Sequence, residues 1–147
     1  MIEKCMENWH KHLRGELEGG LDALLDDDCV FYSPIVFTPQ KGKDLTKMYL
    51  QAAGSTFTGG GEPTEEAFKA ATKEGGGSFG YRNEVMSGNT AVLEFEAEVA
   101  GKYVNGIDMI TCNDEGKIVE FKVMIRPLQA VNLMHAQMKA MIEKMQG

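Results

Sequence analysis

The chain has 147 residues, about the length of one ordinary domain and enough to bury a substantial hydrophobic core. Its 22 acidic and 15 basic residues give a formal net charge of -7, so a nucleic-acid partner is not expected, because phosphate binding needs clustered Lys and Arg. The three cysteines form no CxxC pair, which indicates neither a disulfide framework nor a zinc site and favours a reducing, cytoplasmic location. There is no basic start before an apolar run and no apolar stretch of about 18 residues, so we expect neither a targeting signal nor a membrane span.

The first part of the chain is predicted to form two helices. The opening helix follows from apolar residues that recur every three or four positions and so share one face: Met6, Trp9, Leu13 and Leu17. We expect this helix to end at the pair Gly19-Gly20 and a short second helix to follow at 21–25. The acidic run 26–28 is expected to be a solvated turn.

A strand and a third helix are predicted next. Residues 29–33 are β-prone and stop at Pro34, and the stretch 45–53 places its apolar side chains on one side of a helix. Two glycine triplets then flank a segment at 59–77, which we expect to be an insertion. Neither triplet has the sequence context of a phosphate-binding loop.

The second half is predicted to be an antiparallel sheet, because four β-prone segments follow one another with no room for crossover helices. Its turns are expected at 87–89, 100–102 and 113–116. In the strand 91–99 apolar residues alternate with glutamates, which gives a dry face and a wet face. We expect these glutamates to be solvated or to meet Lys122 and Arg126 of the last strand. They form a flat row, whereas a metal site needs a concave cage.

Asp108 is the candidate catalytic residue. It is the lone carboxylate in the otherwise uncharged segment 103–112, and an unpaired buried carboxylate costs several kcal/mol, so it must be neutralised, paired or used. The alternative is that Asp108 hydrogen-bonds the Trp9 indole or a backbone amide and only closes the floor of a pocket. Ile107 and Met109 face away from Asp108 by strand alternation, which indicates a buried outer face and hence a dimer.

A C-terminal helix is predicted over 128–145. It carries a methionine-rich apolar stripe: Val131, Met134, Met138, Met141 or Ile142, and Met145. Leaving this stripe in water would cost much of a domain's stability, so we expect it to be covered. It packs on its own domain, contacts a second subunit or forms a lid over the ligand pocket. His135 stands alone among aliphatic residues here, and neither it nor His10 or His12 is expected to bind a metal or to catalyse.

The order of these elements resembles the NTF2-like superfamily, and within it the SnoaL-like and ketosteroid-isomerase-like branch. The segments that carry the resemblance are 23–34 (ALLDDDCVFYSP) and 106–123 (GIDMITCNDEGKIVEFKV), and it extends from about 6 to 132. It implies one α+β domain over 1–147, in which a strongly curved antiparallel sheet wraps around three N-terminal helices. Such a cone has a ligand pocket at its wide end and commonly forms a homodimer.

The resemblance also implies roles for three residues. Asp108 matches the protonated aspartic acid of the oxyanion hole in ketosteroid isomerases. The tyrosine of the first helix corresponds to Trp9, whose indole donates a hydrogen bond but has no acidic hydroxyl. The general base, an aspartate before a proline, corresponds to Ser33, and a serine without a partner base cannot shuttle a proton at useful rates. The steroid-isomerase mechanism is therefore doubtful.

Two classes of function remain. The first is a cyclase-type or isomerase-type enzyme acting on a carbonyl compound, with Asp108 as acid/base and Asn105 or a tyrosine orienting the carbonyl. The second is a non-catalytic binding module. In both cases we expect a small hydrophobic ligand and no cofactor, metal or membrane. The expected protein partner is a second copy of the chain, which would form a homodimer. The expected pocket lining is Trp9, Phe31, Ser33, Phe95, Phe121, Val123 and Ile125.

Overall fold

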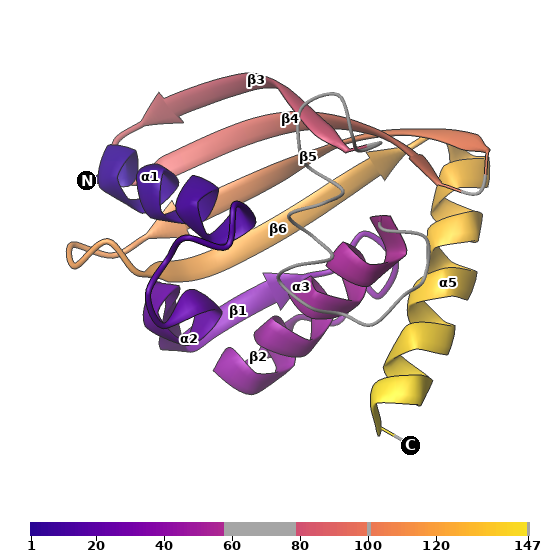
Figure 1. Cartoon of the computed structure of the whole chain (residues 1–147), viewed down its shortest axis with the longest axis horizontal. Helices are drawn as coiled ribbons and strands as arrows, with labels where there is room; N and C mark the ends of the chain where they lie inside the picture. The colour runs from indigo at the N-terminus through magenta and orange to yellow at the C-terminus, as the bar shows by residue number, and fades with distance from the viewer. Residues whose placement is uncertain (58–78, 100, 147) are drawn as a thin grey trace.

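The computed structural model describes residues 1–57, 79–99 and 101–146 and shows a mixed α+β fold (Figure 1). The predicted insertion at 59–77 lies outside these residues. The elements in chain order are α1 (Ile2–Leu13), α2 (Gly20–Leu24), β1 (Leu25–Tyr32), β2 (Gln40–Lys41), α3 (Lys43–Phe57), β3 (Gly80–Ser87), β4 (Thr90–Val99), β5 (Lys102–Cys112), β6 (Ile118–Arg126) and α5 (Leu128–Gln146).

The described strands form one curved sheet in the order β2-β1-β6-β5-β4-β3. The four strands of the second half pair antiparallel, as the sequence predicts, because only two to five residues separate each strand from the next. Gly88 and Gly116 adopt the positive φ that two of these turns need, 60° and 78°. The antiparallel prediction does not extend to β1, which pairs with β6 in parallel.

The first half differs from prediction at two boundaries. α1 ends at Leu13, before Gly19, because Gly15 takes a left-handed conformation with φ 71° and its N–H caps the last turn on the His12 carbonyl. β1 begins at Leu25, so the acidic run is part of a strand and not of a turn. The side chains of Asp27 and Asp28 remain exposed there, which avoids the cost of burying their charges.

The core consists of two clusters of buried side chains. The first lies between the sheet and the helices α1 and α2 and contains Trp9, Phe31 and Phe121. The second lies towards α5 and contains Phe79, Phe95, Ala130 and Met134 among others. Three half-buried side chains pack against both clusters and so mark the seam between them: Tyr49, Tyr81 and Val123.

The C-terminal helix α5 follows directly from β6 and contacts α3 (Figure 1). Met134 of its predicted stripe is 2% exposed and packs in the second cluster, so the stripe is covered by its own domain at this position. The side chains of Met138, Met141, Ile142 and Met145 lie outside the described residues. None of the described helices is both long and apolar enough to cross a membrane.

Candidate functional site

Asp108 lies in the middle of the sheet, on β5. Its ladder partners are Leu93 of β4 and Val123 of β6, and all three side chains alternate onto the face that packs against the helices. The Asp108 residue is 7% exposed. The carboxylate predicted from sequence is therefore buried on the inner face of the sheet, beside the seam between the two core clusters.

Two donors form a chain that ends on this carboxylate. The Tyr81 hydroxyl donates to Oδ2 of Asp108 at 2.6 Å, and Nε1 of Trp9 donates to the Tyr81 oxygen at 3.1 Å. One alternative from the sequence was a direct hydrogen bond from Trp9 to Asp108. In the structure Trp9 is instead connected to Asp108 through the Tyr81 hydroxyl. Both bonds orient the Tyr81 proton towards Asp108 and fix which carboxylate oxygen it approaches.

The buried position gives Asp108 an unusual acidity. Burial raises its pKa to about 7 from an ordinary 3.8, although the Tyr81 hydrogen bond opposes part of that rise. The Tyr81 pKa is raised well above its ordinary value by burial and by the nearby Asp108 charge, so this hydroxyl keeps its proton. At neutral pH Asp108 populates both protonation states, as a group that donates and accepts protons requires.

His12 lies close to the same relay and takes no proton at neutral pH. Its ring packs on Trp9 with centroids 5.5 Å apart, and burial lowers its pKa to about 4. The neutral His12 imidazole therefore adds no positive charge next to Trp9. Of these two buried groups, Asp108 is the one that changes charge near neutral pH.

The sequence did not identify Tyr81. It lies on β3, an edge strand that is mostly exposed and lacks a clear alternating pattern. Its ladder partner is Phe95, and a register irregularity follows it between Tyr81 and Asn83. The sequence indicated only that some tyrosine would orient a carbonyl. It could not indicate which one, because strand register decides which tyrosine reaches Asp108.

The seven predicted pocket residues fall into two groups. Trp9, Phe31, Phe95 and Phe121 are core side chains, each 1–3% exposed. Ser33, Val123 and Ile125 line a cavity of about 530 Å³ between β6 and the chain that follows β1. Tyr32, Phe37 and Lys122 also line this cavity. The predicted lining residues that border a cavity therefore lie just after β1 and beside it on β6.

A second cavity, of about 210 Å³, meets the first at Ser33. Its walls come from the loop after β1, from α3 and from α5. The lining residues are Ser33, Ile35, Val36, Tyr49, His135, Lys139 and Glu143. Ser33 Oγ accepts hydrogen bonds from the amides of Ile35 at 3.0 Å and Val36 at 3.3 Å, so it holds the loop between the two cavities in shape.

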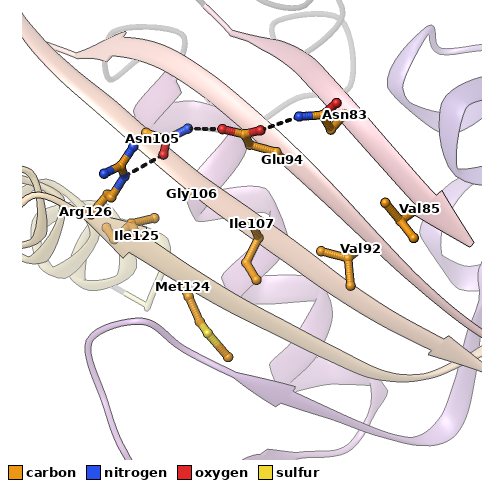
Figure 2. A pocket seen from close by; sticks show the side chains of 10 residues that line it. All are labelled: Asn83, Val85, Val92, Glu94, Asn105, Gly106, Ile107, Met124, Ile125 and Arg126. Atoms are coloured by element: carbon orange, nitrogen blue, oxygen red, sulfur yellow. Dashed lines mark hydrogen bonds between the residues drawn. The ribbon is translucent and has the colours of Figure 1, made fainter.

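Asn105 cannot orient a carbonyl beside Asp108, so that expectation was wrong. Three positions separate the two residues along β5, which places their side chains on opposite faces of the sheet. Asn105 Nδ2 instead donates to Glu94 at 3.0 Å, and its Oδ1 accepts from Arg126 Nε at 2.7 Å (Figure 2). The strand order explains why Glu94 does not meet Arg126 directly, since β5 lies between their strands.

The outer face of the sheet carries an apolar groove beside this polar network (Figure 2). We call it the outer groove; its volume is about 450 Å³, and its apolar lining includes Val85, Val92, Ile107 and Met124. Val85 is 64% exposed and Met124 is 47% exposed. The outer groove lies on the side of the sheet opposite to Asp108.

Comparison with known proteins places the fold. No protein-family model matches the chain, and no curated protein matches it by sequence. Among solved structures, a steroid delta-isomerase from Pseudomonas aeruginosa is 28% identical, with a TM-score of 0.77 over 97% of this chain and 92% of that chain. An NTF2-like protein of unknown function from Mesorhizobium loti is 15% identical, with a TM-score of 0.58 over 86% of this chain and 91% of the other.

A putative polyketide cyclase from Sinorhizobium meliloti is also similar in fold. It is 11% identical, with a TM-score of 0.56 over 82% of this chain and 94% of that one. These likenesses and the curved sheet packed on its helices define an NTF2-like cone. The chain therefore has the fold of NTF2-like proteins, as its element order predicted.

Proposed function

We propose that this protein is an enzyme that moves a proton on a small hydrophobic carbonyl compound, with Asp108 as the acid/base. The observation that carries the proposal is the relay from Trp9 through Tyr81 to a buried carboxyl group. The similar structures named as a steroid delta-isomerase and a putative polyketide cyclase support the same class of chemistry.

The site suits a carbonyl group whose oxygen gains negative charge. Protonated Asp108 can donate to that oxygen, while Tyr81 holds the other side of the carboxyl group and Trp9 holds Tyr81. A donor fixed in advance in a buried site stabilises developing charge more than it would in water, because it needs no reorganisation and is weakly screened. The apolar walls contributed by Val123 and Ile125 favour a hydrophobic ligand body.

The test is exchange of the α-hydrogens of a ketosteroid and of a small cyclic ketone in D₂O, followed by NMR. We expect the native protein to accelerate exchange and the variant Asp108→Asn to lose at least about a hundredfold of that acceleration, the usual minimum for a general acid or base. Asp114→Asn, in the exposed turn before β6, is the matched control and should exchange at the native rate.

Equal exchange by native protein and Asp108→Asn would refute the catalytic role of Asp108. The second candidate, a binding module, predicts the reverse pattern: the ketone binds tightly to both proteins and no exchange exceeds that of buffer. The cavities around Ser33 favour this candidate as well, since an apolar cavity alone is enough for binding.

We further propose that the outer groove packs against a second copy of the chain. Carboxylates near the groove are already hydrogen-bonded within the chain, Glu94 to Asn83 at 2.7 Å and Glu96 to Arg82 at 2.7 Å, which favours no strongly charged partner. The exposed Val85 and Met124 flank Ile107 and Val92, so one surface carries both the groove and the projecting side chains that could fill it (Figure 2). Such self-complementarity is what an isologous dimer requires.

Ile107→Glu is therefore expected to convert a dimer into a monomer, because it places a charge in the middle of the apolar contact. Sedimentation equilibrium measures the mass directly. Leu45→Glu is the control: Leu45 is 39% exposed on α3 and does not line the outer groove, so its variant should remain dimeric. A monomeric native protein, or a dimer that survives Ile107→Glu, would contradict the proposal.

A further inference from the structure

We propose that His10 of α1 and Glu84 of β3 form a positioning pair, which fixes β3 against α1 so that the Tyr81 hydroxyl stays bonded to Asp108. The inference rests on the proposed function, in which Asp108 handles a proton. Neither member of the pair touches the ligand, and both act through Tyr81. The register of β3 and the contacts of His10 carry the inference.

A bulge in β3 brings Tyr81 and Glu84 onto the same face of the sheet. The ladder partner of Tyr81 is Phe95 and that of Glu84 is Leu93, and both partners are buried on the inner face. Strict alternation would put residues three positions apart on opposite faces. Arg82 is the extra residue, since the ladder passes from Tyr81 directly to the next position after it. Bulges of this kind often redirect a side chain next to an active site.

Glu84 uses this position to bind α1. Its two carboxylate oxygens lie 3.1 and 3.3 Å from Nε2 of His10, and the side chains of His10 and Glu84 are 32% and 31% exposed. His10 is in the last turn of α1, where the helix dipole favours a positive charge. The preceding residue, Trp9, donates to the Tyr81 hydroxyl. Two successive residues of α1 therefore hold two residues on the inner face of β3.

The His10 ring also packs on Tyr81 directly. The two rings meet edge-on, with centroids 5.9 Å apart and an interplanar angle of 84°. The Phe79 ring meets Tyr81 edge-on as well, with centroids 5.2 Å apart. These contacts hold the phenol ring, while the bonds to Trp9 and Asp108 hold its hydroxyl. A displacement of His10 is therefore passed to Tyr81.

β3 needs such a contact because it is an edge strand. It has a neighbouring strand only on the β4 side, and the bulge interrupts that ladder next to Tyr81. Asp108 lies on β5, which has a strand on each side. A strand paired on one side opens locally at a lower free energy than a central strand. The pair on α1 therefore secures the less firmly held partner of the hydrogen bond between Tyr81 and Asp108.

The first test is exchange of the α-hydrogens of the ketosteroid in D₂O. An exposed ion pair changes an equilibrium by a factor of at most about five, so His10→Ala should slow exchange at saturating ketone about two- to fivefold. The half-saturating ketone concentration should not change, because the pair touches no ligand. Glu84→Ala should cause the same loss, and the double variant no greater one, since each removes the same interaction.

Two further variants serve as controls for this loss. His10→Gln keeps a neutral N–H donor for Glu84 and should restore the native rate. Glu7→Gln removes an exposed carboxylate that pairs with Lys11 of the same helix, and it should also exchange at the native rate. The loss is therefore expected only when the bond between α1 and β3 is broken.

The second test, a ¹³C NMR titration of the Asp108 carboxyl group, needs no ligand. The Tyr81 hydrogen bond lowers the pKa of Asp108, so loosening that bond in His10→Ala should raise the measured pKa by about 0.5, the logarithm of a threefold change. The rise should be absent in the Tyr81→Phe background, since His10 acts through the Tyr81 hydroxyl. A merely structural role predicts a lower stability in urea with no change in the pKa of Asp108.

An Asp108 pKa that is unchanged in His10→Ala, or that rises equally in the Tyr81→Phe background, would overturn the inference. A rate loss that His10→Gln does not restore would overturn it as well. Exchange that is lost in Asp108→Asn but unchanged in His10→Ala refutes the role of the pair alone. If the native protein exchanges no ketone, the proposed function fails, while the titration still decides whether His10 and Glu84 position Tyr81.

Discussion

Asp108→Asn is expected to be more stable than the native protein by an amount that grows with pH. Burial raises the pKa of Asp108 to about 7 in the folded state, against 3.8 for the exposed group. Between these values the folded state binds more protons than the unfolded state, so the native free energy of unfolding falls as the pH rises. The loss is about 1.4 kcal/mol per pH unit, or about 4 kcal/mol from pH 4 to 7, and it levels off above pH 7. Asn does not titrate and escapes this loss.

Urea unfolding of both proteins between pH 4.5 and 8.5 measures the effect. The other carboxylates also change the free energy of unfolding with pH. Hydrogen bonds lower the pKa values of Glu94 and Glu96, for example, so their stabilisation is lost in acid. These contributions are the same in both proteins and cancel in the difference between them. Tyr81→Phe should raise the pKa of Asp108 further, because the Tyr81 hydrogen bond lowers it. A difference between Asp108→Asn and native protein that is flat across this range would show that folding does not raise the pKa of Asp108.

Gly106→Ala is expected to destabilise the protein by about 3 kcal/mol, at the upper end of the usual cost of overpacking. A Cβ atom at Gly106 would lie 2.5 Å from the Met124 carbonyl oxygen, 2.6 Å from Phe95 Cζ and 2.8 Å from Ile125 Cγ2. The first of these is backbone of the neighbouring strand, so relief requires the β5–β6 ladder to move. Gly106 is therefore needed for close packing two residues from Asp108.

Gly80→Ala is the matched control, since it also replaces a strand glycine but its added Cβ meets nothing within 4 Å. Its free energy of unfolding should stay within about 0.5 kcal/mol of the native value. Thermal or urea unfolding compares the two variants directly. Equal stability of Gly106→Ala and Gly80→Ala would mean that β5 and β6 are less closely packed at this point than the structure shows.

The candidate site was only partly readable from the sequence. Asp108 could be identified because a lone carboxylate in an uncharged strand is a local feature that needs an explanation. Tyr81 could not, since its contact with Asp108 depends on the pairing of β3 with β4 and of β4 with β5. Asn105 was misplaced even though strand alternation alone puts it on the face opposite to Asp108.

The sequence by itself determined the antiparallel order of β3 to β6 and the burial of their inner face, because alternation and turn residues act between near neighbours. The tertiary structure decided three further features: the parallel pairing of β1 with β6, the relay from Trp9 through Tyr81, and the shared cavity of Ser33 and His135. Each joins segments distant in the chain, and the free energy that holds them together comes from burying the surfaces they share. A local pattern of residues does not show which distant segments will pack against one another.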